Sequence, residues 1–205
     1  MKHAIKCSAV LLQEFFGMSG KAELRKQLME REAGFSKNYI AESNAGIIRN
    51  IFSLKEFQGA GTVLFFYGIR SEPDTREMMR RAFELGKTVA LPKTYPKGVM
   101  SARKIVGFDE LSQSRFGIPE PAESAQEIGP DELDFIVVPA TALDSEGYRL
   151  GRGAGYYDRY LSYTSAFACG VVRGKMLVSR VPREKHDIRM NCVVTENEIF
   201  RFKGK

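Results

Sequence analysis

Three glycines alternate with other residues in the segment Arg149–Asp158, which reads RLGRGAGYYD. Glycine reaches backbone conformations with positive φ and lets backbone N–H groups approach a ligand closely. Where such a loop leads into a helix, the free N–H groups and the helix dipole favour a bound anion. Arg149 and Arg152 add permanent charges on planar donor groups that suit phosphate oxygens. The segment is therefore predicted to be a phosphate-binding loop.

A tight turn with solvated arginines is the alternative interpretation of the same residues. The segment matches neither the dinucleotide-binding glycine pattern nor the Lys-Ser/Thr phosphate loop. The prediction of a phosphate site therefore depends on further cationic or polar residues elsewhere in the chain.

A second pair of cations, Lys21 and Arg25, lies near the start of the chain. A helix is predicted from Lys21 to Arg31, with Ser19 as its N-cap and Leu24 and Leu28 on its apolar face. Residues four apart share a helix face, and two like charges there repel mildly. An anionic ligand would relieve this repulsion, whereas an exposed charged helix face is the alternative interpretation.

The composition is that of a globular chain: 205 residues, 43% hydrophobic and 27% charged. The formal net charge of +6 suggests an anionic partner, but the basic residues are dispersed, so we expect no nucleic-acid partner. No apolar run approaches membrane length, so we expect no membrane partner. Cys7, Cys169 and Cys192 are predicted to be reduced thiols of a cytoplasmic protein, and two histidines make a zinc enzyme an unfavoured interpretation.

Alternating strand and helix patterns predict the elements that position these residues. Further helices are predicted over 36–54 and 74–85, and strands over 61–67, 88–92, 100–106, 134–139, 166–172 and 192–195. The predicted fold is α/β, with a single open, mostly parallel, Rossmann-like sheet and helices on both faces. Residues 1–205 are predicted to form one domain, with 1–18 as an N-terminal extension and a small subdomain over 93–130 as an alternative.

Ligands of such sheets bind outside the carboxyl ends of the strands. The loop after the strand over 61–67 and the glycine loop both follow a predicted strand. Glu72, in the first of these loops, is therefore a candidate ligand contact, although an exposed loop glutamate is more often solvated.

Several short motifs in order resemble the 5-formyltetrahydrofolate cyclo-ligase family, also called methenyltetrahydrofolate synthetases. The matching segments are Lys21–Arg25 (KAELR), Glu72–Thr75 (EPDT), Gly117–Pro121 (GIPEP), Gly147–Arg159 (GYRLGRGAGYYDR), Pro182 with His186–Asp187, and Val194–Glu196. The resemblance covers about residues 21–196, and its specificity lies in the ordered set.

The resemblance implies an ATP- and Mg²⁺-dependent conversion of 5-formyltetrahydrofolate to 5,10-methenyltetrahydrofolate, with release of ADP and phosphate. Transfer of the γ-phosphoryl group to the formyl oxygen would give an iminium phosphate, which the N10 nitrogen attacks to close the ring. Phosphoryl transfer relies on positioning and charge stabilisation, so the absence of a nucleophile triad in the sequence is consistent with it.

The resemblance also implies roles for individual residues. Lys21 and Arg152 are expected to be catalytic, and Asp158 and Asp187 to bind Mg²⁺. The residues expected to bind ATP are Lys21, Ala22, Glu23, Leu24, Arg25, Arg149, Leu150, Gly151, Arg152, Gly153, Ala154, Gly155, Tyr156 and Tyr157. The residues expected to bind folate are Tyr67, Glu72, Arg152, Gly153, Ala154, Gly155 and Tyr156. A monomer is expected, with folate and ATP as its partners.

Two positions depart from the family pattern: Met176 stands where the family often has glutamine, and Leu143-Asp144 where it usually has Phe-Asp. Two other functions remain as alternatives. One is a sugar-phosphate isomerase or CoA-transferase-like enzyme on a similar sheet. The other is a binding module without turnover, such as an inactive folate- or nucleotide-binding relative or an RNA-binding protein.

Overall fold

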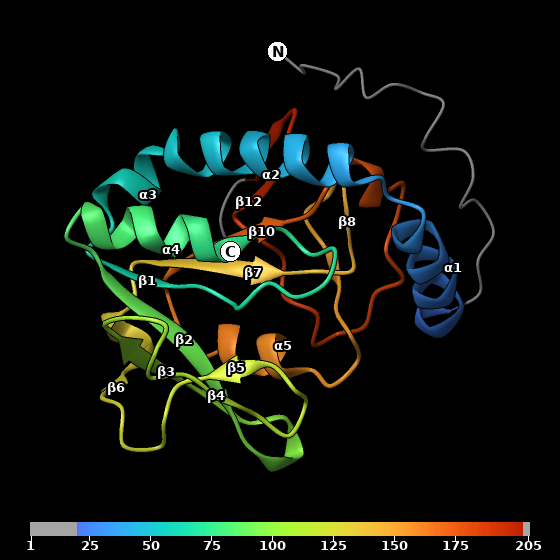
Figure 1. Ribbon diagram of the computed structural model, residues 1–205. Coiled ribbons are helices and arrows are strands. Elements are labelled where there is room, and N and C mark those ends of the chain that lie inside the picture. Colours follow the sequence, from blue (N-terminus) through green and yellow to red (C-terminus); the bar gives the residue numbers. More distant parts are fainter. Residues whose placement is uncertain (1–19, 203–205) are drawn as a thin grey trace.

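Parallel strands form the centre of an eight-stranded sheet in the computed structural model, which describes residues 20–202 (Figure 1). The order across the sheet is β13 (Ile199–Arg201), β12 (Cys192–Val194), β10 (Phe167–Val171), β7 (Phe135–Pro139), β1 (Thr62–Leu64), β2 (Thr88–Thr94), β3 (Met100–Ile105) and β6 (Glu127–Ile128). The strands from β12 to β2 pair in parallel, whereas β13, β3 and β6 pair antiparallel. The predicted open, mostly parallel sheet is confirmed.

The chain reverses its direction of travel across the sheet at β1. Val63 of β1 pairs with Val89 of β2 on one side and with Phe135 of β7 on the other. From β1 the chain first adds β2 and later adds β7, β10 and β12 on the opposite side. The loops that leave the carboxyl ends of β1 and β7 therefore diverge, which opens a crevice at this switch point.

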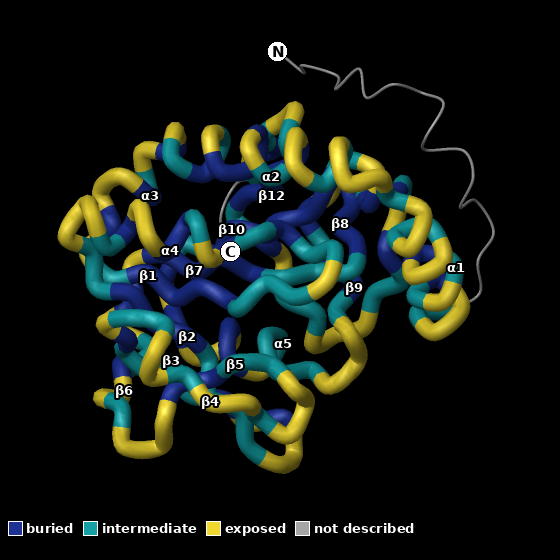
Figure 2. Tube along the Cα trace, viewed as in Figure 1, coloured by how far each residue is buried: buried dark blue, intermediate teal, exposed yellow. Residues whose placement is uncertain are grey.

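Helices cover both faces of the sheet because the strand residues alternate in direction. Val63 faces a core shared with α2 (Lys37–Phe52), α3 (Lys55–Gly59) and α4 (Thr75–Glu84). Leu64 faces a second core shared with α1 (Lys21–Ala33) and α5 (Tyr156–Leu161). Figure 2 shows the central strands buried and the outer surfaces of the helices exposed. The predicted helices on both faces are confirmed.

Side-chain caps explain where two of the helices begin. The Ser36 hydroxyl accepts a hydrogen bond from Tyr39 N at 3.2 Å, and the Asp74 carboxylate accepts one from Arg76 N at 3.1 Å. Gly20 occupies the N-cap position of α1, and the predicted cap Ser19 lies outside the described residues, as does the predicted extension over 1–18.

The helix predicted from residue 36 to about residue 54 is confirmed, although it ends slightly earlier than expected. Helix α2 stops at Phe52, and Leu54 adopts an extended backbone (φ −71°, ψ 125°) before the separate helix α3. Leu54 and Phe57 are each 1% exposed in the core beneath these helices. The break between α2 and α3 therefore coincides with burial of both apolar side chains. Helix periodicity in the sequence did not indicate this break.

Several short strands were not predicted. β4 (Ser112–Gln113) pairs with β5 (Pro119–Glu120), and β8 (Ala142–Asp144) pairs with β9 (Arg149–Leu150) and β11 (Leu177–Val178). The prediction of a loop at residues 149–150 is therefore wrong, and the loop proper covers 151–155.

The strand predicted over 61–67 ends at Leu64. β3 and β6 continue the main sheet, and the assignment of one domain stays a prediction.

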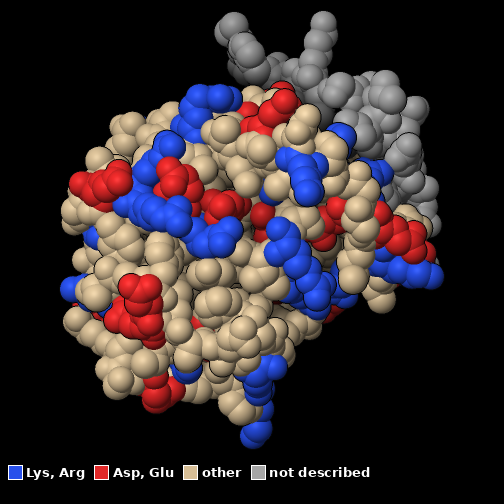
Figure 3. Space-filling view, viewed as in Figure 1, with Lys and Arg blue, Asp and Glu red and all other residues tan. Residues whose placement is uncertain are grey.

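Basic and acidic side chains are interspersed on the face shown in Figure 3. Within residues 20–202, no helix is both long enough and apolar enough to cross a membrane.

We expect Gly46→Ala to destabilise the fold by about 1–3 kcal/mol, since extra volume in a packed site forces backbone shifts. A β-carbon at Gly46 would lie 2.6 Å from Glu196 O, in the turn between β12 and β13. Gly59→Ala is the matched control, because no atom lies within 4 Å of its β-carbon position. Urea denaturation of both variants measures the effect, and equal stability of the two would contradict the close approach.

Candidate active site

A pocket of about 550 Å³ lies at the switch point of the sheet. Its walls come from the exits of β1 and β7, the first turn of α1, the glycine loop, the β4–β5 hairpin and the segment over 184–187. The residues that carry its charge and chemistry are Lys21, Arg25, Tyr67, Glu72, Glu120, Arg149, Arg152, Tyr156, Tyr157, Asp158, Glu184, His186 and Asp187. Lys21 and Arg152 therefore share one pocket although they lie far apart in the sequence.

Two arginines hold the backbone of the glycine loop. Arg25 Nε donates to Gly151 O at 2.8 Å, and Arg159 Nη1 donates to Ala154 O at 2.8 Å. Gly153 and Gly155 have φ of 106° and 71°, in the left-handed region that favours glycine. Among residues 20–202, Arg25 has no carboxylate within ion-pair distance. Its charge is thus left for a ligand in the pocket.

Lys21 is paired with Asp187 at one side of the pocket. Its Nζ donates to Oδ1 at 2.9 Å and to Oδ2 at 2.8 Å, and Glu184 Oε1 lies 3.2 Å away. Burial opposes ionisation of Asp187, but the hydrogen bonds from Lys21 and from Glu184 N outweigh it and lower its pKa. Asp187 is therefore a carboxylate beside a cation that faces the same cavity.

Arg152 and Glu72 form a second pair, with Arg152 Nη2 2.6 Å from Glu72 Oε1. The Glu72 side chain is 15% exposed and also accepts a hydrogen bond from Ile69 N at 3.1 Å, whereas the Arg152 side chain is 56% exposed. Burial raises the pKa of Glu72, and attraction to Arg152 offsets only part of this effect. The carboxylate is thus held at the wall of the pocket, and the guanidinium extends towards its opening.

Arg149 and Asp158 form a third pair, at 2.8 Å between Nη2 and Oδ1. The Arg149 side chain is 4% exposed, so the interpretation as a solvated arginine is wrong for this residue. The ion-pair contact is close but not aligned as a hydrogen bond, and Nε and Nη2 have no hydrogen-bond acceptor among the described residues. Arg149 therefore retains donor capacity beside the pocket.

Tyr156 lines the pocket and is held by contacts with the segments around Tyr95 and Phe116. Its hydroxyl donates to Tyr95 O at 2.9 Å and accepts from Arg115 Nη2 at 2.6 Å. The ring of Phe116 meets it edge-on, with 6.5 Å between centroids. Burial raises the pKa of Tyr157 and raises that of Tyr160 to about 12. Both phenols remain neutral, and Tyr156 is the ring that presents a fixed aromatic surface.

Four predicted ATP-binding residues do not line the pocket: Ala22, Glu23, Leu24 and Leu150. Positions 21 and 25 share the face of α1 that turns to the cavity, and the intervening residues point elsewhere. Leu24 and Leu150 are buried in the core. Met176 is also buried and lies behind the Glu72 loop, beside a second small cavity.

Glu120 is a pocket residue to which sequence reasoning assigned no role. It is 4% exposed and accepts hydrogen bonds from Thr94 Oγ1 at 2.7 Å and Thr94 N at 3.3 Å. The sequence feature that could have indicated Glu120 is its position within the Gly117–Pro121 motif. The buried carboxylate adds a fixed acceptor to the wall near Phe116.

The carboxylates predicted to bind a metal, Asp158 and Asp187, both line the pocket. No group of three or more His, Cys, Asp or Glu residues suited to a metal occurs within residues 20–202. Mg²⁺ is commonly held by one or two carboxylates together with substrate phosphates and water. Two carboxylates lining a cationic pocket fit that donor set, so the residues present are compatible with Mg²⁺ that enters with a nucleotide.

Residues 17–196 match the model of the 5-formyltetrahydrofolate cyclo-ligase family. The chain belongs to this family. It is 34% identical to a 5-formyltetrahydrofolate cyclo-ligase of Mycolicibacterium smegmatis, over 85% of this chain and 93% of the relative. It is 31% identical to one of Escherichia coli, over 70% of this chain and 82% of the relative. The resemblance found in the sequence is confirmed.

Solved structures agree with this assignment to the cyclo-ligase family. The fold is similar to an NMR structure of Aquifex aeolicus 5,10-methenyltetrahydrofolate synthetase, with a TM-score of 0.80 and 32% identity over 90% of this chain and 94% of that one. A 5,10-methenyltetrahydrofolate synthetase of Mycoplasma pneumoniae shares the fold at a TM-score of 0.71 and 16% identity, over 87% of this chain and 99% of that one. The roles of individual residues stay predictions.

We expect the difference in unfolding free energy, Glu72→Gln minus wild type, to rise as pH increases above 4.5, the ordinary pKa of this carboxyl. Because the pKa of Glu72 is raised in the folded protein, the unfolded chain loses this proton at lower pH than the folded protein does. As pH increases above 4.5, this difference lowers the free energy of unfolding of the wild type. The glutamine variant lacks that cost. Urea denaturation across a pH series measures the difference.

Glu77→Gln is a control of opposite sign, because hydrogen bonding to Arg81 lowers the pKa of Glu77. Its difference from wild type should fall as pH increases. A pH-independent difference for Glu72→Gln would contradict the burial effect.

Proposed function

We propose that this family member catalyses the ATP- and Mg²⁺-dependent cyclisation of 5-formyltetrahydrofolate to 5,10-methenyltetrahydrofolate, with release of ADP and phosphate. The observation that carries the proposal is the convergence of Lys21, Arg25, Arg149 and Arg152 on one pocket that also holds Glu72 and Tyr156. Anion-binding and aromatic-binding groups thus lie within the same cavity.

The cationic side of the pocket would hold the triphosphate. Among residues 20–202, the Arg25 guanidinium is hydrogen-bonded only to a backbone carbonyl, and Arg149 keeps unused donors, so both can donate to phosphate oxygens. Lys21 supplies a point charge that is prepositioned by Asp187. The backbone N–H groups of 151–157 would complete the phosphate site.

The other side would hold the reduced pterin. Glu72 can accept hydrogen bonds from its amino and ring N–H groups, and Tyr156 can stack on the flat ring. Tyr67 lines the same wall. Arg152 lies next to Glu72 and belongs to the glycine loop, so its guanidinium would meet both ligands. This position suits stabilisation of charge on the transferred phosphoryl group.

The chemistry balances without a protein nucleophile. The formyl oxygen forms a bond to the γ-phosphorus as the bond to ADP breaks, which makes the formyl carbon an electrophilic iminium. The N10 nitrogen then bonds to that carbon, loses its proton, and phosphate departs with the former formyl oxygen. The protein's contribution is alignment of the two ligands and stabilisation of developing negative charge.

Asp158 and Asp187 would hold Mg²⁺ through carboxylate oxygens. The ion, when bound, neutralises phosphate charge and orients the phosphates. The pairs that these carboxylates form with Arg149 and Lys21 hold their side chains in place at the pocket wall. The cations can therefore remain beside the phosphates that the ion binds.

We further propose a monomeric, cytoplasmic enzyme. Cys169 and Cys192 are free buried thiols, which is typical of a reducing compartment.

We expect the purified protein, incubated with 5-formyltetrahydrofolate, ATP and Mg²⁺, to form methenyltetrahydrofolate. The product absorbs in the near ultraviolet, where the substrate does not, so its formation is followed directly. Reactions that lack ATP or Mg²⁺ serve as controls. Ligand binding without growth of this absorbance would instead identify an inactive relative.

We expect Arg152→Ala to lower turnover by roughly 10²–10³-fold, the usual effect of removing a donor that stabilises transition-state charge. Stability should fall far less than turnover, because the Arg152 side chain is 56% exposed. Arg80→Ala is the matched control, since Arg80 on α4 is 57% exposed and also pairs with a glutamate. A structural role would instead lower melting temperature and activity together.

A further inference from the structure

Arg173 lies just after β10 and is 1% exposed, yet no carboxylate among the described residues lies within ion-pair distance of it. A buried charge is costly unless it is paired or fully hydrogen-bonded. Neutral acceptors must therefore compensate this guanidinium.

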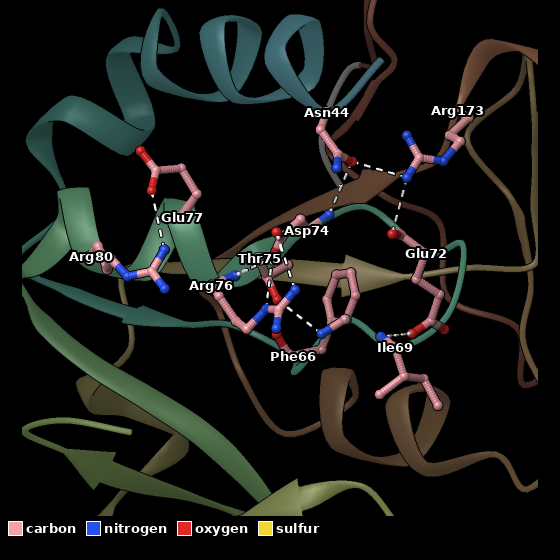
Figure 4. A network of polar contacts seen from close by, with 11 residues as sticks. Asn44, Phe66, Ile69, Glu72, Asp74, Thr75, Arg76, Glu77, Arg80 and Arg173 are labelled. Carbon is pink, nitrogen blue, oxygen red and sulfur yellow. Dashed lines mark hydrogen bonds and ion pairs between the residues drawn. The ribbon is translucent and has the colours of Figure 1, made fainter. Parts of the chain in front are cut away.

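All five N–H groups of the guanidinium have acceptors. Nε donates to Ser71 O at 2.8 Å, Nη1 donates to Ile40 O at 3.1 Å and to Ser43 Oγ, and Nη2 donates to Asn44 Oδ1 at 2.9 Å and Glu72 O at 3.1 Å. Figure 4 shows the two bonds of Nη2 joining α2 to the loop that carries Glu72.

The acceptors on α2 share one face of the helix. Ile40, Ser43 and Asn44 are three and four positions apart, which places them side by side. Asn44 Oδ1 also accepts a hydrogen bond from Asp74 N at 3.2 Å. Arg173 and Asn44 together therefore anchor the loop over 71–74 to a helix that is packed on the sheet.

The acceptors on the loop are the consecutive carbonyls of Ser71 and Glu72. They fix the backbone of Glu72 on the side away from the pocket. On the pocket side, Glu72 Oε2 accepts from Ile69 N, and Oε1 accepts from Arg152. The loop includes a non-glycine residue with positive φ, Arg70 at 55°, so its conformation is one that a chain rarely adopts without external contacts.

We propose that Arg173 is a positioning residue for the folate site: it holds the main chain of Ser71 and Glu72 so that the Glu72 carboxylate faces the pterin. This inference rests on the proposed function, in which Glu72 binds the substrate. It assigns a specific task to a residue in the segment that also contains Met176, where the chain departs from its family pattern.

Arginine is suited to this task because its planar group presents five donors in a fixed arrangement. Lysine keeps the charge but has three donors on a single nitrogen, so it cannot serve five acceptors spread over a helix and a loop. Methionine fills similar space without donors. Arg173→Lys and Arg173→Met therefore separate charge from hydrogen-bond geometry.

Steady-state kinetics of Arg173→Lys, Glu72→Gln and the double variant test the proposal. We expect Arg173→Lys to raise the KM for 5-formyltetrahydrofolate by roughly 10–100-fold, since small misplacements of a binding group have effects of that order. The KM for ATP should stay within about twofold. In the Glu72→Gln background, Arg173→Lys should add no more than about twofold, because residues that act through one another are not additive.

Three outcomes would overturn the inference: an unchanged folate KM in Arg173→Lys, equal rises in the folate and ATP KM values, or full additivity with Glu72→Gln. If Glu72→Gln itself leaves the folate KM unchanged, the proposed function of Glu72 fails instead. Arg201→Lys is the matched control, because Arg201 donates to Glu56 on a surface remote from the pocket, and its KM values should equal those of the wild type.

Amide hydrogen exchange provides a readout that is independent of activity. In Arg173→Met, the amides of Ile69 and Asp74, which donate to Glu72 Oε2 and Asn44 Oδ1, should exchange at least about tenfold faster, because local opening controls exchange. The β7 amides should be unaffected. Unchanged exchange at Ile69 and Asp74, or equal acceleration in β7, would contradict local positioning. If that variant does not fold, Asn44→Ala replaces it by removing one acceptor of Arg173. Because Asn44 Oδ1 is also the acceptor of Asp74 N, the test then reads the Ile69 amide alone.

Discussion

Charge compensation at one edge of the sheet is the constraint on which the rest of the structure depends. Lys21 with Asp187, Arg152 with Glu72 and Arg149 with Asp158 form pairs at 2.6–2.9 Å that line a single pocket. In each pair, a cationic and an anionic side chain compensate each other where water is partly excluded. The same groups are then available to a ligand that carries phosphate and metal, because the pocket remains open beside them.

The parallel sheet makes this arrangement feasible. Reversal of strand order at β1 separates the loops that leave β1 and β7, and the crevice between them receives α1 and the glycine loop. Alternation along each strand directs Val63 to one core and Leu64 to the other, so helices on both faces fix the position of this edge. The two cores therefore fix the backbone of this edge, and the ion pairs fix the side chains along it.

Arg173 illustrates a different solution to the cost of burial. Lys21, Arg149 and Arg152 face carboxylates in the pocket. Arg173 instead faces neutral oxygens on α2 and on the loop 71–72. A carboxylate partner would neutralise the charge locally, but backbone carbonyls also define the course of the chain. Carboxylate partners therefore set the charge that the pocket presents to a ligand, whereas carbonyl partners set the conformation of the loop.

The sequence by itself determined the family, the parallel α/β class and the helices on both faces, because these follow from ordered motifs and from local hydrophobic patterns. It also indicated Lys21, Arg25, Glu72 and the glycine loop as pocket residues. Only the tertiary structure decided that Arg149 belongs to β9 and is buried, that Leu24 and Leu150 turn into the core, and that Arg173 has five acceptors. Those outcomes depend on contacts between residues far apart in the chain, which local periodicity does not encode.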